Sequence, residues 1–160
     1  MAGSFAVPKV AVPAHVLMAG DSARPGQVFV AERVPQHDGP ETVLEMLNRA
    51  ESFFPFRPEG GGAGEGFIFV SKLQTVSVTQ HRQAPIADPA RLSAAKLIGL
   101  ELVLAEGSAI AGWASVELPP EQSRLLDYLN STDDPFFAVW THAATHYVHR
   151  GHVRFARPMD

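Results

Sequence analysis

The sequence predicts a mainly β protein built from two tandem small barrels, and two observations lead to this prediction. Short apolar segments alternate with glycine- and proline-containing turns along the whole chain, a pattern typical of small closed β-structures. The chain also repeats one order of features: two strands with glycines beside them, a segment that ends in Leu-Asn, a Phe-Phe pair and a basic residue after the fourth strand. Such self-similarity defines the structural unit.

The repeat divides the chain into a first half over residues 9–81 and a second half over residues 96–158. A linker over residues 82–95, which contains Pro85 and Pro89, joins them. Each half is predicted to be a five-stranded barrel with one short helix inserted after its second strand. The expected strands cover residues 10–18, 27–33, 52–57, 67–70 and 75–78, and then residues 99–105, 112–118, 136–141, 145–149 and 153–156.

The two helices are expected to end at Asn48 and Asn130, because Asn tolerates the left-handed conformation that often terminates a helix. Pro40 and Glu41 favour the start of the first helix, and the Pro119-Pro120 pair precedes the second. Small barrels are expected because closure protects the edge strands of a sheet.

Composition restricts the class of function. The chain has 160 residues, a net charge of −4 and no cysteine, so we expect neither disulfides nor thiolate chemistry. The negative charge disfavours RNA as a partner, because nucleic-acid binding depends on many contacts from Lys and Arg to phosphates. We see no signal peptide and no apolar run of about 20 residues that could cross a membrane. A bacterial, cytoplasmic protein that does not contact the membrane is the expectation.

The end of the second half resembles the Sm-like family. Tyr147-Val148-His149-Arg150-Gly151-His152-Val153 is similar to the second Sm signature, in which Arg-Gly occupies the turn between the last two strands. The resemblance implies an SH3-like or Sm-like barrel and a turn that binds single-stranded RNA, with His149, Arg150, Gly151 and His152 as the contacting residues. Lys72 occupies the matching place in the first half, where the Arg-Gly pair is absent.

The order of strands, glycines, Leu-Asn and Phe-Phe is also similar to a bacterial family of small β-domains for which no activity is known. That resemblance covers nearly the whole chain and implies a fold without implying a reaction.

Adjacent aromatic residues suggest an interaction surface. Phe53-Phe54 and Phe136-Phe137, with Trp140, lie on predicted strands, where neighbouring side chains point to opposite faces. One ring of each pair should therefore lie outside its own barrel, either between the two halves or on a surface for another protein or a second copy. The apolar run Phe67-Ile68-Phe69-Val70 is expected to be covered on both faces, within the protein or between subunits.

Four of the seven histidines lie near the C-terminus, namely His142, His146, His149 and His152. Histidine is a common metal ligand, yet His142 and His146 would be about 13 Å apart on a strand that rises ~3.3 Å per residue. We therefore expect no metal and no other cofactor. The sequence predicts a non-catalytic interaction or scaffold module with a regulatory role; an Sm-like RNA-binding protein is the alternative, and a histidine-metal enzyme is a weaker one.

Overall fold

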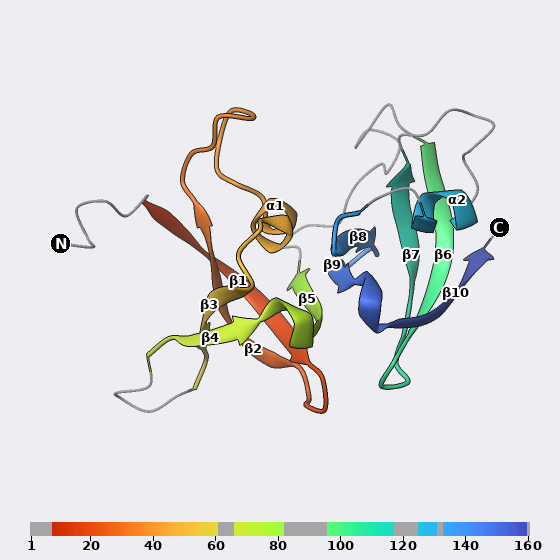
Figure 1. Ribbon diagram of the computed structural model, residues 1–160, viewed down its shortest axis with the longest axis horizontal. Helices are drawn as coiled ribbons and strands as arrows, with labels where there is room; N and C mark the ends of the chain where they lie inside the picture. Colours follow the sequence, from red (N-terminus) through yellow and green to blue (C-terminus); the bar gives the residue numbers. More distant parts are fainter. Residues whose placement is uncertain (1–7, 61–65, 82–95, 117–124, 131–132, 160) are drawn as a thin grey trace.

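The computed structural model describes residues 8–60, 66–81, 96–116, 125–130 and 133–159, and Figure 1 shows their arrangement. The first half contains five strands and one helix: β1 (Lys9–Met18), β2 (Arg24–Ala31), α1 (Val43–Asn48), β3 (Phe53–Pro58), β4 (Ile68–Ser71) and β5 (Thr75–His81). The second half has the same order: β6 (Lys96–Leu104), β7 (Ala109–Val116), α2 (Leu125–Asn130), β8 (Phe136–Trp140), β9 (Ala144–His149) and β10 (Val153–Met159). The mainly β class is confirmed, whereas the expected linker lies outside the described residues.

All ten strands belong to one antiparallel sheet, in the order β10-β6-β7-β8-β9-β5-β1-β2-β3-β4. The two halves join where β5 pairs with β9, and Figure 1 shows these strands side by side at the centre of the molecule. We call this pairing the inner junction. The sheet is thus open and continuous, which differs from the two separate barrels that the sequence predicts. Local patterns specify strands, but they do not specify which edge of one half pairs with the other.

The two halves match position by position, and residues that hold the same place in the strand pairing are called equivalent below. Residues of α1 and α2 are matched from the last residue of each helix, and those of the turns from the end of β4 and of β9. Phe53 lies opposite Ser71 just as Phe136 lies opposite His149. The register shifts at the same place in both halves. Leu17 and Met18 of β1 face Ser77 and Thr75 of β5, and Val103 and Leu104 of β6 face Phe155 and Val153 of β10, so one residue of the fifth strand is skipped each time. This shared bulge shows that the likeness extends to irregular features.

Two equivalent glycines allow the second and third strands of each half to approach each other closely. A Cβ on Gly26 would lie 2.3 Å from the carbonyl oxygen of Arg57, and one on Gly112 would lie 2.1 Å from that of Trp140. These distances are far below van der Waals contact, so only glycine fits. The repeated glycines of the sequence therefore have a packing role in both halves.

α1 begins with a complete capping box. The Glu45 N–H donates to Thr42 Oγ1 (3.1 Å), and the Thr42 N–H donates to Glu45 Oε1 (2.8 Å). This arrangement satisfies two N–H groups that a helix start leaves unpaired. The helix therefore starts two residues after the position that Glu41 predicts. The predicted start of the second helix, near Glu121, lies outside the described residues.

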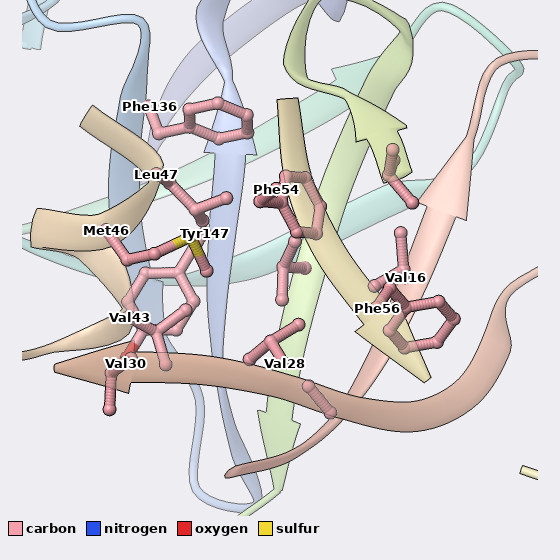
Figure 2. Close-up of a cluster of buried hydrophobic side chains, with 13 residues drawn as sticks. Val16, Val28, Val30, Val43, Met46, Leu47, Phe54, Phe56, Phe136 and Tyr147 are labelled. Atoms are coloured by element: carbon pink, nitrogen blue, oxygen red, sulfur yellow. The ribbon is translucent and has the colours of Figure 1, made fainter. Parts of the chain in front are cut away.

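Two apolar clusters form the core, and each receives side chains from both halves. The cluster in the first half includes Phe54 and Phe56 of β3 and Met46 and Leu47 of α1, together with Phe136 and Tyr147 of the second half. Figure 2 shows Phe136 and Tyr147 beside the side chains of α1. The cluster in the second half contains Val76 of β5 in return. Each half is therefore completed by its neighbour across the inner junction.

Candidate functional site: the β4 edge of the sheet

The sheet ends at β4 on one side and at β10 on the other, and within the described residues neither strand has a partner on its outer side. Large exposed apolar side chains gather at the first of these ends. We call them the β4 edge patch: Phe53 (58% exposed), Phe67 (47%), Ile68 (37%) and Phe69 (73%).

Strand alternation explains which of these rings are exposed. Val70 lies opposite Phe54, and both point into the core, whereas Phe69 lies opposite Pro55 on the other face. The ring of Phe67 packs edge-on against Phe29, with 5.1 Å between ring centroids, and the Arg57 guanidinium lies 4.6 Å from its centroid. The patch is thus held in place by an aromatic pair and a cation–π contact.

The expectation that residues 67–70 are covered on both faces is wrong for the single chain. Val70 is buried, but Phe69 is the most exposed of the large apolar side chains. The sequence shows an apolar run that suits burial, and the structure leaves that run at an edge. Nothing in the described part of this chain covers Phe69.

The predicted aromatic surface separates into different environments. Phe54, Phe136 and Phe137 are buried, Trp140 is half-buried and Phe53 is exposed. Phe136 enters the core of the first half and Phe137 enters that of the second. The second Phe-Phe pair therefore corresponds to contact between the halves, and Phe53 is the member that a partner can reach.

The basic residues of the two turns face their own helices. Lys72 is buried, and its Nζ donates to the carbonyls of Met46 and Arg49, at 3.0 Å each. The equivalent Arg150 donates to the carbonyl of Leu129 at the end of α2. Burial lowers the pKa of Lys72, with a smaller contribution from the charge of Arg49. Both cations satisfy carbonyls that a helix end leaves unpaired.

The histidines of the second turn also make contacts within the chain. His149 Nδ1 accepts from the Gly151 N–H (3.0 Å), and its ring packs edge-on against Phe136. His152 Nε2 forms a hydrogen bond with the carbonyl oxygen of Leu73 (2.8 Å) and so ties the second turn to the first. Burial, followed by the charges of His152 and Arg150, lowers the pKa of His149. This turn acts as a structural link between the halves.

Three further histidines lie at the inner junction. His146 Nδ1 pairs with the Thr79 hydroxyl (2.9 Å), and the His15 and His81 rings pack edge-on with centroids 4.9 Å apart. Burial lowers the pKa of His146, and the charge of His81 adds to this. His142 lies away from them, against Trp113. Within the described residues no three His, Asp or Glu side chains are placed to hold one metal ion.

The opposite end of the sheet also carries exposed apolar side chains, which the sequence did not single out. Phe155 and Met159 of β10 are 43% and 45% exposed, and Leu126 of α2 is 68% exposed. Phe155 and Met159 have a weak signal in the sequence, because each stands alone between polar or small neighbours, whereas Leu126 follows Leu125 on a helix. The sheet order is what brings Phe155 and Met159 to a free edge.

Comparison with protein-family models, with curated proteins and with solved structures finds no match to this chain. In the part of the chain that the structure describes, none of the helices is both long and apolar enough to span a membrane. The candidate site therefore rests on geometry alone.

Proposed function

We propose that the protein is a non-catalytic interaction or scaffold module that binds an extended segment of a partner along β4. The observation that carries this proposal is the β4 edge patch, a group of ordered aromatic and aliphatic side chains at an unpaired strand. Free edges are usually protected by charges, prolines or covering elements. β4 contains only Ile-Phe-Val-Ser, so its shortness limits pairing, but it carries neither a charge nor a proline.

Binding of this kind adds a strand to the sheet. The main chain of the partner supplies hydrogen bonds, and alternate side chains supply specificity. Because β4 has only four residues, its backbone alone offers few hydrogen bonds. Burial of Phe53 and Phe69 would supply the larger share of the affinity, at roughly 25 cal/mol per Å² of apolar surface.

A photo-crosslinking residue in place of Phe69 tests the proposal in cells. Leu73 is the matched control, because its side chain is also apolar and is 71% exposed but lies on the short turn after β4 (Lys72–Gln74). The proposal expects position 69 to crosslink to an extended segment, identified by mass spectrometry, and Phe53→Asp in the same chain to abolish the product. Equal yields at positions 69 and 73, or no dependence on Phe53, would refute it.

RNA binding at the second turn is the alternative function, and we consider it weaker. It would require Arg150 to exchange its contact with α2 for a phosphate. An RNA-binding protein would show salt-sensitive association with a single-stranded oligonucleotide. We expect fluorescence anisotropy at low salt to show no binding that depends on Arg150.

We further propose that the two halves descend from one small barrel-like unit of the Sm-like or SH3-like kind. The shared strand order, the shared bulge and the equivalent glycines Gly26 and Gly112 support this origin. A polypeptide of residues 1–81 that folds, either alone or as an oligomer joined edge to edge, would support this origin. A polypeptide that stays unfolded at every concentration would argue against it, since a unit that cannot fold could not have been the ancestor.

A further inference from the structure

The inner junction and the two free ends of the sheet involve the same two kinds of strand. At the junction, β9, the fourth strand of its half, pairs with β5, the fifth strand of the other. At the ends of the sheet, β4 is again a fourth strand and β10 is again a fifth strand. The molecule thus contains one pairing of a fourth strand with a fifth strand, and its two free edges are a fourth and a fifth strand that could form another such pairing.

The fourth-strand side shows what such a junction buries. Phe136 and Tyr147 are 1% and 9% exposed because they enter the core of the first half. Their equivalents are Phe53 and Phe69, as the pairings of β3 with β4 and of β8 with β9 show. These two are the most exposed members of the β4 edge patch. Phe53 and Phe69 are therefore aromatic like their buried equivalents, but no second core covers them.

The fifth-strand side shows the same relation. At the inner junction the Asn48 side chain binds the backbone of Phe136 twice: its Nδ2 donates to the carbonyl (3.1 Å), and its Oδ1 accepts from the N–H (2.9 Å). The equivalent residue in α2 is Asn130, which is exposed and whose side chain has no hydrogen-bond partner among the described residues. It is placed to bind the backbone of Phe53 in another chain.

The side chains of α1 are more deeply buried than the equivalent side chains of α2. In α1, Met46 and Leu47 are buried in the cluster that contains Phe136. Their equivalents in α2, Tyr128 and Leu129, are half-buried, and Leu126 beside them is exposed. Tyr128 and Leu129 pack against the cluster of the second half, so α2 differs from α1 mainly at Leu126, which is exposed where the equivalent Leu44 is half-buried.

Resting on the proposed strand-binding function, we propose that the partner is a second copy of this chain, bound head to tail. The β4 edge of one copy pairs with the β10 edge of the next, in the register of the inner junction. Because Val78 faces Tyr147 and Thr79 faces His146 at that junction, Ala156 faces Phe69 and Arg157 faces Ile68 between copies. Such an interface is heterologous, so the copies form a closed ring or an open fibre.

The contact between copies is weaker than the inner junction, for reasons visible on β10. Pro158 lacks an N–H and removes one donor from the ladder. Arg154 and Arg157 add charge to the strand, a feature that limits edge pairing. Since β4 carries no charged residue, these arginines meet no like charge. Assembly is therefore reversible and depends on protein concentration.

The absence of cysteine in the natural sequence makes disulfide trapping a direct test. Ile68→Cys and Arg157→Cys are prepared as separate proteins, then mixed and oxidised. The proposal expects a disulfide-linked dimer between positions 68 and 157 in the mixture, little product from either protein alone, and at least a tenfold lower yield when Phe69→Asp is added to the Ile68→Cys chain. Thr79→Cys with His146→Cys in one chain is the positive control and closes within the chain.

Two results overturn the proposal while the control pair closes: a mixture that gives no linked dimer, or a yield that Phe69→Asp does not change. Crosslinking at position 69 in cells then shows whether only the second copy is wrong as the partner or whether strand binding along β4 is wrong as well. If position 69 captures a segment of a different protein, the second copy is excluded as the partner and the strand-binding function remains. If position 69 captures no more than position 73, both proposals fail.

Discussion

The inner junction and the outer edges of this protein are formed by equivalent strands in opposite environments. Phe136 and Phe53 each begin a Phe-Phe pair, at equivalent positions on β8 and β3. The first of these is buried and the second is exposed. The difference comes from the neighbour. β8 and β9 meet the other half of the chain, whereas the outer side of β4 and the face of β3 that carries Phe53 have no neighbour in the described structure. Burial at these positions is therefore a property of the assembly of units and cannot be deduced from the unit alone.

The largest effect is expected from truncating this pair of rings one at a time. Phe136→Ala removes a ring from the core of the first half and should lower the free energy of unfolding by about 3–5 kcal/mol. Phe53→Ala, measured in dilute solution, should change it by less than about 0.5 kcal/mol, as exposed substitutions do. Urea unfolding of both variants measures the difference. Similar losses for the two would show that the junction does not decide burial.

A smaller effect is expected from the two equivalent asparagines. Asn48→Ala removes both bonds to the Phe136 backbone and leaves a donor and an acceptor without partners, which costs about 1–3 kcal/mol. Asn130→Ala should leave the stability of the single chain unchanged and should instead reduce trapping between positions 68 and 157. A loss of stability in Asn130→Ala as large as in Asn48→Ala would remove the distinction between inner and outer positions.

The smallest effect is expected from pH, and His146 at the inner junction should contribute to it together with His149 of the second turn, whose pKa burial also lowers. Burial, and then the charge of His81, lowers the pKa of His146, so the unfolded chain takes up the proton more readily than the folded protein does. Stability is therefore full above about pH 6.5, the ordinary pKa of histidine, and falls as the pH drops below it. His146→Asn keeps an acceptor for Thr79 and should show a smaller fall in melting temperature between about pH 7.5 and about pH 5.5. An unchanged fall would place the titration at another group.

Much of the unit could be predicted from the sequence. The order of strands and helices follows from apolar periodicity and turn residues, and both helices end at Asn48 and Asn130 as predicted. The reason given for these ends is wrong, because neither Asn adopts the left-handed conformation. Pro55 lies on β3 inside the sheet, but the pairing of β3 with β2 stops at Phe56, so Pro55 has a neighbour only in β4. The sequence pattern thus predicts those features whose contacts come from residues close in the chain.

The arrangement of the two units could not be predicted, for a physical reason. The β5–β9 pairing joins segments far apart in the chain, and its register depends on which side chains fit the other core. The histidines illustrate this. A series of imidazoles near the C-terminus suggested metal or RNA, whereas His146 pairs with Thr79 and His152 pairs with the Leu73 carbonyl across the junction. Their residue type was visible in the sequence, but their partners were not.

Amide hydrogen exchange over a range of protein concentrations compares the inner junction with the outer edges most directly. The account predicts slow exchange in β5 and β9 at every concentration. It predicts fast exchange in β4 and β10 in dilute solution, with both strands becoming protected together as the concentration rises, and no such change in Phe69→Asp. Fast exchange in β4 and β10 at every concentration, or protection of one without the other, would contradict it.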